Sequence, residues 1–414
     1  MTLSRILKKA FIVSFIAFSS ILLLCSIWVY TNRDTVIDKF VTEANKYLNT
    51  PVEVGKITLS IFETFPLIKI ELEDVHITGN LPEEDSKPLL TAKRIEVLLD
   101  PFAVLDGNLS IKGVRLLNAT CSMILQRDGT TNYQIFKKKD SAVKSKMDFE
   151  LSSVLLKDIN YYYQNDGSKL RMHTVAKSAK ANLILEGGTY YIKSDGQYTI
   201  SSIMVKQREY VSNKSLDGNI SITYQTDLKS VKIEKSIVKI DGSRFLTDVT
   251  YSFQEKIPYI NLSLEGEQTS IETIFNLLPA RISKNFKRYK SRGSAFFSLR
   301  LEGQIRHKTG PQLAIDFGLE NAEISYPNSA LTIEGVSTKG LFLAEDILNL
   351  STGTLEMTDI RGKFENKDFM SELVYKDFHN PHLTLAFDGA FELSSLSKLA
   401  DISQIEDASG LMVL

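Results

Sequence analysis

The sequence predicts a mainly β protein: an N-terminal transmembrane helix, then an elongated, curled antiparallel sheet with a few short helices. Three observations lead to this prediction. The first 30 residues contain a long uncharged run, apolar residues occupy alternate positions in many later segments, and a short pattern recurs along the chain. A period of two residues is typical of a strand with one dry face and one wet face.

The composition excludes some classes of function. The 414 residues include 49 Lys and Arg against 50 Asp and Glu, which gives a formal net charge of −1. This balance provides no positive field that would attract nucleic acid, so we expect no nucleic-acid partner. Only two cysteines are present, Cys25 within the uncharged run and Cys121 within a predicted strand, so we expect no intramolecular disulfide.

Residues 10–30, AFIVSFIAFSSILLLCSIWVY, form the uncharged run. A helix of this length spans the hydrocarbon core of a bilayer. The preceding segment 1–9 is basic, so we expect a cytoplasmic N-terminus, a single pass through the inner membrane and a periplasmic location for the rest. A cleaved signal peptide or a lipoprotein anchor at Cys25 fits less well, because no A-x-A site follows the run and Leu24 precedes the cysteine.

The segment 31–50 has the period of an amphipathic helix. Its predicted apolar face comprises Val36, Ile37, Phe40, Val41, Ala44, Tyr47 and Leu48. Asp34 can cap this helix and Pro51 stops it. Two further short helices are expected at 270–279 and 393–402, and the Lys-rich stretch 137–146 is expected to be a solvated loop.

The candidate binding surface is the apolar face of the first predicted strands. In the segment GKITLSIFETFPLIKIELEDVHITGN (55–80), and again near residue 97, apolar residues alternate with polar ones. Nine residues represent this face: Ile57, Leu59, Ile61, Ile68, Ile70, Leu72, Ile95, Val97 and Leu99. Something must cover such a face, because exposed apolar area costs about 25 cal/mol per Å².

Three arrangements would cover this face. The sheet can fold on itself as a sandwich, close as a barrel, or curl into a trough that holds an apolar ligand. An outer-membrane barrel turns its apolar side outward and fits poorly with an N-terminal membrane anchor. A sandwich and a trough share the same alternation, so the pattern leaves both open.

A short motif repeats along the chain: an apolar residue, one free position, Asp or Asn, and then a small or apolar residue. Its six copies are centred on Asp74, Asn118, Asp158, Asp248, Asn321 and Asp359. In several copies the apolar parity slips by one across the Asp or Asn, which predicts a β-bulge or bend at that residue. A second pattern, L-x-[LF]-[ED]-G, occurs at 262–266, 299–303 and 385–389. Together these patterns indicate a series of repeated hairpins.

The sequence lacks the common short motifs for catalysis or cofactor binding. The sequence contains no phosphate-binding loop, no H-E-x-x-H, no G-x-S-x-G and no C-x-x-C. His379 and His382 in HNPH, and the acidic stretch 83–85, are better explained as turns than as metal sites. We therefore expect no catalytic residue, no metal and no cofactor.

Three stretches carry a resemblance to the AsmA family of Gram-negative bacteria. The first is the anchor, the amphipathic helix and then GKITLSIFETFPLIKIELEDVHI. The second is 92–136, which ends in a D-G-x-x-N-aromatic turn formed by Asp128, Gly129, Asn132 and Tyr133, and the third is 270–327. Asp-Gly favours a tight reversal, and Asn132 can bond to nearby backbone.

This resemblance implies a repeated β-groove in the periplasm, related in architecture to TamB and to chorein-type lipid carriers. Residues 51–136 would be its N-terminal part and 147–414 its continuation, and the groove would hold phospholipid acyl chains for lipid transport and outer-membrane assembly. Family members of this kind usually extend beyond the point that corresponds to Leu414, so we expect a truncated or short member. About 18 strands at about 4.8 Å spacing would give a trough on the order of 85 Å long.

Two other functions compete with lipid carriage. The first is an envelope scaffold or assembly factor built from closed β-sandwiches, which would contact other envelope proteins and carry no lipid. The second is a surface adhesin, which would need a route across the outer membrane that the predicted anchor does not provide.

Overall fold

The computed structural model describes residues 30–413 except 82–86, 136, 138–148, 255–256, 278–289, 307, 326–331 and 393–410. Before residue 30 it describes only Ile16, Ser20, Leu23, Ile27 and Trp28. Most of the predicted transmembrane helix, the predicted helix at 393–402, nearly all of the Lys-rich stretch and the acidic stretch 83–85 therefore lie outside the described residues. Within the described part of the chain, no helix is long and apolar enough to span a membrane.

The fold is mainly β, with one mostly antiparallel sheet of eighteen strands and a few short helices, as the sequence predicts. The chain divides into two compact units, residues 1–167 with 173–186, and residues 168–172 with 187–414. The first unit contains α2 (Arg33–Tyr47), β1 (Val52–Ser60), β2 (Ile68–Ile77), β3 (Leu90–Leu99), α3 (Pro101–Leu105), β4 (Ile111–Leu125), β5 (Phe149–Asn165) and most of β6 (Leu170–Glu186).

The second unit contains the remaining elements. These are β7 (Thr189–Val205), β8 (Arg208–Gln225), β9 (Ser230–Ile240), β10 (Ser243–Ser252), β11 (Tyr259–Ser270), α4 (Ile271–Leu277), β12 (Lys290–Gln304), β13 (Gln312–Ser325), β14 (Thr332–Ala344), the 3-10 helix η2 (Leu350–Thr352), β15 (Thr354–Phe364), β16 (Lys367–Lys376), β17 (His382–Glu392) and β18 (Leu411–Val413).

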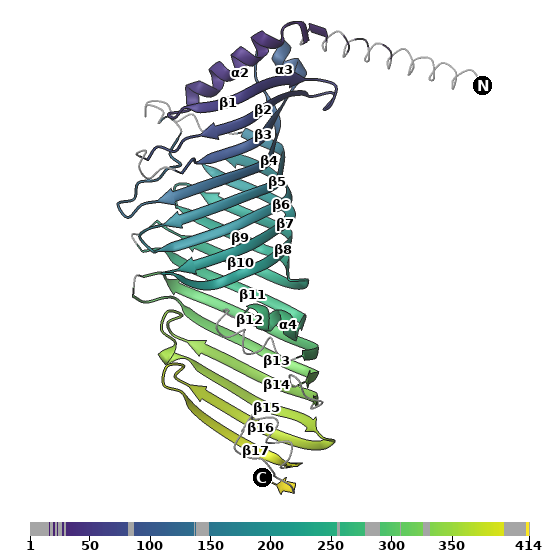
Figure 1. Ribbon diagram of the computed structural model, residues 1–414, viewed down its shortest axis with the longest axis vertical. Helices are drawn as coiled ribbons and strands as arrows, with labels where there is room; N and C mark the ends of the chain where they lie inside the picture. The colour runs from purple at the N-terminus through teal and green to yellow at the C-terminus, as the bar shows by residue number, and fades with distance from the viewer. Residues whose placement is uncertain are drawn as a thin grey trace, which may run out of the picture. The chain divides into compact units, whose positions relative to one another are not determined.

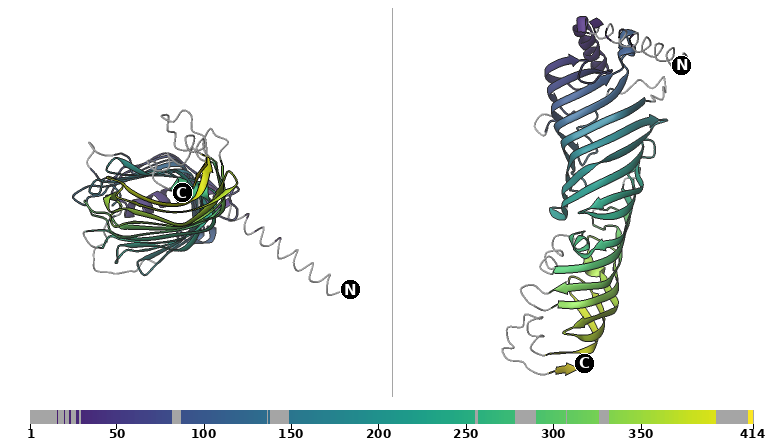
Figure 2. Two further views of the ribbon diagram at one scale, coloured as in Figure 1. Left: turned by 90° about the horizontal axis from the view of Figure 1, so that it is seen from below. Right: turned by 90° about the vertical axis from the view of Figure 1, so that its right-hand side faces the viewer.

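Within each unit, strands that follow one another in the sequence pair with one another. In the first unit β1 to β4 pair antiparallel and β4 pairs with β5 in parallel (Figure 1). In the second unit the neighbouring strands from β7 to β18 all pair antiparallel, and the green to yellow strands from β11 to β17 lie side by side (Figure 2). This serial pairing confirms the predicted run of hairpins, apart from the parallel step.

The predicted helices in the described residues are present. The helix expected within 31–50 is α2, which lies along β1 (Figure 1). The prediction that Asp34 caps it is wrong: Asn32 holds the cap position, and Asp34 lies in the first turn, 3.4 Å from the Arg33 guanidinium. The helix expected at 270–279 is α4, whose first turn is capped by Ser270, since its Oγ accepts a hydrogen bond from the Thr273 backbone at 3.1 Å.

The repeated Asp or Asn marks a bulge or bend, as the sequence predicts. The strand register shifts by one residue at Asp248, Asn321 and Asp359. The pairings at Asp74 and Asn118 continue without a shift, so the strands bend there. Five of the six motif residues have a left-handed backbone, with φ between 48° and 55°: Asp74, Asn118, Asp158, Asn321 and Asp359. Asp and Asn tolerate this conformation better than other non-glycine residues. In the sixth copy, the residue with positive φ lies on the neighbouring strand: Lys235 has φ 40° and its N–H donates to the Asp248 carboxylate.

Each bulge keeps the apolar residues of its strand on one face. In β13, the apolar residues before the bulge, Phe317 and Leu319, have odd numbers, and those after it, Ala322 and Ile324, have even numbers. The extra residue in the bulge brings both pairs to the same face of the sheet. Side-chain hydroxyls bond to backbone groups near the bulges, for example Ser337 Oγ to the Asn321 N–H at 3.2 Å. Where such a bulge occurs, it explains the parity slip seen in the sequence.

Candidate functional site

An extended apolar surface lies on one face of the second unit's sheet. Directly paired residues of neighbouring strands point to the same side, so the pairings show which residues share this face. One row of paired residues crosses from β7 to β14: Ile192, Ile222, Ile233, Val249, Leu262, Leu301, Leu313 and Ala344. A second row crosses from β11 to β17: Leu264, Leu299, Ile315, Phe342, Leu355, Tyr375 and Leu383. We call this surface the apolar face.

The apolar face is only partly covered by protein. In the first row, every residue from Ile192 to Leu313 is intermediate in exposure, and Ala344 alone is buried. Toward β17 the exposure increases: Leu383 and its neighbour on the same face, Leu385, are 59% and 56% exposed. Side chains sandwiched between two sheets would be largely buried. The face therefore has apolar surface that the described residues leave open to solvent.

Helix α4 covers one part of the apolar face. Its residues Ile271 and Ile274 are buried in a cluster with Phe245 of β10 and with Ala295 and Phe297 of β12. Phe245 and Phe297 make an edge-to-face contact, with 6.2 Å between ring centroids. Here the chain itself supplies the cover, and this patch is a protein core.

Among the described residues, charged side chains are rare on the apolar face, and its Lys214 and Lys367 are each paired with a carboxylate. Lys214 lies 3.3 Å from the Asp241 carboxylate, and Lys367 lies 2.7 Å from Glu392. The opposite face of the same strands carries residues such as Glu265, Asp316 and Glu356. The sheet of this unit is thus amphipathic.

Eight of the nine residues predicted for the candidate surface lie within the first strands, and these eight share one face, as the alternation predicts. The pairings Ile57–Leu72–Ile95, Leu59–Ile70–Val97 and Ile68–Leu99 place eight of them together, and Ile61 follows β1 directly. Six of the nine are buried: Ile61, Ile68, Ile70, Leu72, Val97 and Leu99. The chain itself covers most of this part of the face, and the six buried residues belong to a protein core.

Helices α2 and α3 accompany the buried first strands. Val36 of α2 and Val104 of α3 are buried, and α2 contacts β1. Lys39 of α2 donates a hydrogen bond to the Gly107 carbonyl just after α3. Further along this unit, the same face continues as Leu116 and Leu156, both half-buried.

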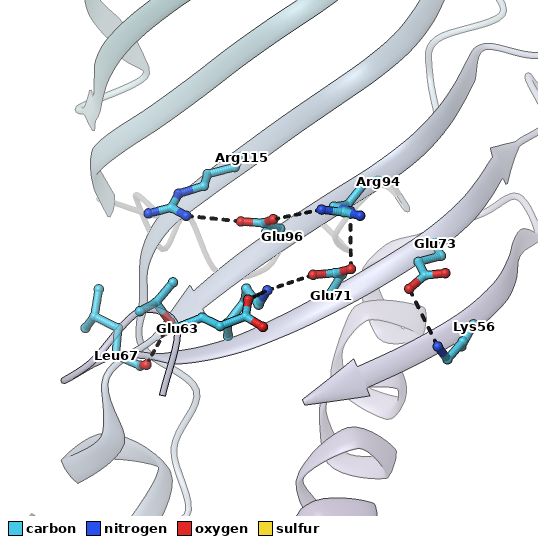
Figure 3. A network of polar contacts seen from close by, with 10 residues as sticks. Lys56, Glu63, Leu67, Glu71, Glu73, Arg94, Glu96 and Arg115 are labelled. Carbon is cyan, nitrogen blue, oxygen red and sulfur yellow. Dashed lines mark hydrogen bonds and ion pairs between the residues drawn. The ribbon is translucent and has the colours of Figure 1, made fainter. Parts of the chain in front are cut away.

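The opposite face of the first strands carries a chain of ion pairs (Figure 3). Glu71 and Glu96 are paired across β2 and β3, and both are buried. Arg94 lies 3.2 Å from Glu71, Arg115 lies 3.2 Å from Glu96, and Lys69 lies 2.7 Å from Glu71. These cations compensate two facing carboxylates that would otherwise repel each other.

The pKa values within this network follow from its contacts. Burial works to lower the pKa of Lys69, but its hydrogen bonds to Glu63 and Glu71 outweigh burial, so the pKa lies above the ordinary value. The hydrogen bond from Lys69 holds the pKa of the exposed Glu63 below its ordinary value. Lys69 and Glu63 are therefore both charged at neutral pH, which favours a structural role for their ion pair.

The turn that carries the family resemblance has the predicted local structure. Asp128 accepts hydrogen bonds from the N–H and Oγ1 of Thr130, at 2.9 and 2.7 Å, and Gly129 has φ +91°. Asn132 is fully buried and bridges β4: its Oδ1 accepts from the Ile124 N–H at 2.8 Å and its Nδ2 donates to the Ser122 carbonyl at 2.7 Å. Tyr133 is half-buried beside it. These residues hold the turn in place.

Groups for chemistry are sparse in the described part of the chain. There, no cluster of three or more His, Cys, Asp and Glu side chains could hold a metal ion. Asp377 organises the HNPH turn, since its carboxylate accepts the N–H groups of His379 and Asn380, each at 3.0 Å. Burial raises the pKa of the Cys121 thiol, which keeps it protonated and unreactive.

Sequence reasoning placed the candidate site in the first strands and missed the half-open rows of the second unit. The alternation was visible there, for example in the two L-x-[LF]-[ED]-G segments at 262–266 and 299–303, which supply Leu262, Leu264, Leu299 and Leu301. Alternation alone does not distinguish a covered face from an open one. Comparisons of the chain with protein-family models, with characterised proteins and with solved structures found no match.

Proposed function

We propose that this chain holds phospholipid acyl chains on the apolar face, which would be the concave wall of a β-groove. The observation that carries the proposal is the row from Ile192 to Leu313: seven paired apolar residues on successive strands, all partly open to solvent. A continuous apolar strip of this kind is costly in water, at about 25 cal/mol per Å². A hydrocarbon chain lying along it would remove that cost.

The architecture supports a lipid rather than a protein cover. The described strands form one sheet, whereas a β-sandwich needs two sheets face to face. The rows run across the strands, so an extended guest would meet one apolar side chain at each strand, about 4.8 Å apart. Acyl chains have the length and shape for such a surface, and they need no hydrogen-bond partner.

The mechanism would be passive. Acyl chains would lie on the apolar face, and headgroups would remain in water near the rim. Recognition by hydrocarbon contact is broadly selective, because the face offers few polar groups that could distinguish one headgroup from another. Movement in one direction would then need a gradient or a partner protein, such as an outer-membrane or other envelope protein.

The location proposed for the protein follows from the sequence. The uncharged run 10–30 would anchor the chain in the inner membrane, and the β-structure would lie in the periplasm. The resemblance of three stretches to the AsmA family favours the same location, and it favours a role in lipid transport and outer-membrane assembly.

A second function is favoured by the covered parts of the face. The α4 cluster and the buried residues of β1 to β3 are ordinary protein core. If the open rows were covered by another protein, the chain would be an envelope scaffold that carries no lipid. Site-specific photocrosslinking separates this scaffold from the lipid carrier.

The test is site-specific photocrosslinking of the full chain in membranes. A photoreactive amino acid replaces Leu385, which lies on the apolar face of β17 and is 56% exposed, or Met370, which lies on the opposite face of β16 and is 50% exposed. The lipid carrier predicts phospholipid adducts at position 385 and few at position 370. Protein adducts alone at position 385, or equal lipid labelling at both positions, would refute lipid carriage.

A further inference from the structure

The first unit has two edges, defined by the ends of its strands. The α3 edge comprises the loop 61–67 between β1 and β2, residues 100–110 between β3 and β4, and Ile111, the first residue of β4. The turn edge comprises residues 78–89 and 126–135. The pairing of Ile68 with Leu99 places the two parts of the α3 edge next to each other.

Helix α2 runs from the α3 edge to the turn edge. Near its beginning, Lys39 Nζ donates to the Gly107 carbonyl of the α3 edge. At its end, the Asn45 carbonyl accepts a hydrogen bond from Lys137 at 3.0 Å, and the Asn49 N–H donates to the Ile135 carbonyl at 2.7 Å. The chain therefore enters the first unit at the α3 edge, and α3 lies beside that end of α2 (Figure 1).

The α3 edge exposes large apolar side chains. Phe62 is 77% exposed, Phe65 is 53% exposed and Phe102 is 50% exposed, and Ile111 at the start of β4 is exposed as well. At the turn edge, Leu81, Leu89 and Ile135 are buried, and its described residues expose no large apolar side chain. The two edges are thus chemically different, although the same strands connect them.

We propose that the α3 edge rests in the interfacial region of the bilayer that anchors the chain, with Phe62, Phe65 and Phe102 inserted among headgroups and upper acyl chains. This inference rests on the proposed anchor. The uncharged run 10–30 leads directly into α2 at this edge, so its bilayer is the nearest apolar phase. Aromatic side chains favour the membrane interface, and inserted apolar groups reach about 5–10 Å into it.

The charges at this edge favour apolar insertion over attraction to anionic lipids. Lys112 lies 3.6 Å from the Asp100 carboxylate, and Lys69 is paired with Glu63 and Glu71. No cluster of unpaired basic side chains accompanies the three phenylalanines among the described residues of this edge. Contact with the bilayer is therefore expected to be insensitive to salt and to lipid charge.

The edge can be tested with tryptophan fluorescence in the full chain, reconstituted in phosphatidylcholine vesicles. The chain has one tryptophan, Trp28, within the proposed anchor. In a Trp28→Phe background, single tryptophans are introduced by Phe62→Trp or Phe102→Trp at the α3 edge, or by Arg127→Trp at the exposed turn edge. Quenching is measured with lipids brominated near the headgroup end or near the terminus of the acyl chain.

The inference predicts a blue-shifted emission and a clear loss of fluorescence at positions 62 and 102, strongest with bromine near the headgroup end. It predicts no loss at position 127. Quenching of Trp28 in the unmodified chain with none at positions 62 and 102 would overturn the inference and leave the proposed anchor intact. Absence of quenching at Trp28 as well would overturn both.

Discussion

Replacing Asn321 in β13 tests whether the repeated bulge is held by backbone conformation. Asn321 has φ 48°, and a left-handed conformation costs an ordinary L-residue about 1–2 kcal/mol. For a β-branched residue we expect about 1–3 kcal/mol. The chain cannot easily relax, because loss of the bulge would turn Ala322 and Ile324 away from their face.

We therefore expect Asn321→Val to lower the free energy of unfolding by about 1–3 kcal/mol. Asn321→Gly should cost less than about 1 kcal/mol, because glycine adopts this backbone freely and loses mainly unfolded-state entropy. Glu320→Val is the matched control: its position is exposed, adjoins Asn321 in the same bulge and has no positive φ. There we expect a change within about 0.5 kcal/mol.

The assay is urea unfolding of the full chain followed by circular dichroism, with the slopes of the transitions compared before their midpoints. Equal midpoints for Asn321→Val and Asn321→Gly would refute the reasoning. So would a large loss of stability in Glu320→Val, because it would show that valine disrupts this strand for another reason.

Three further predictions concern other sites. Asn132→Ala should lower the free energy of unfolding by about 2–4 kcal/mol, because it leaves two buried backbone groups without partners; a loss below about 1 kcal/mol in urea unfolding would contradict this. Leu385→Ala should weaken binding of a fluorescent phospholipid by roughly three- to twelvefold, since about half of a leucine's burial energy of about 1.5–3 kcal/mol is at stake. Met370→Ala on the opposite face should leave binding unchanged. The N–H groups of Asn380 and His379 hold the pKa of Asp377 below its ordinary value of 3.8, so the contribution of Asp377 to stability is present above pH 3.8 and is lost as the pH falls through the folded-state pKa. The difference in melting temperature between the wild-type chain and Asp377→Ala should therefore shrink on acidification. A difference that stays constant with pH would contradict this prediction.

The sequence predicted the sheet and its bulges well, because both depend on local pattern. Alternation fixes which residues share a face, and the parity slip at Asp74 and Asn118 coincides with a residue in a left-handed conformation, without a shift of strand register. The helices α2 and α4 followed from their apolar period in the same way. Asn132 was also identified, because its place after an Asp-Gly turn limits the groups it can bond to.

The sequence could not show which part of the apolar face is open. Ile70 and Leu262 have the same alternating context, yet Ile70 is fully buried and Leu262 is half-exposed. The difference depends on contacts between distant segments, such as the covering of Phe245 by α4. The exposed Phe62 and Phe102 were missed for the same reason, since their common edge appears only once β2 and β3 are paired.

The central claim is that hydrocarbon guests occupy the open rows of the apolar face. The most direct measurement is a density map of the full chain, extracted gently from membranes and imaged by electron cryomicroscopy. The claim predicts elongated, non-protein density in contact with Ile222, Leu262 and Leu301, and phospholipid in the extracted sample. Protein side chains packed over these residues, or a solvent-filled surface with no bound lipid, would contradict it.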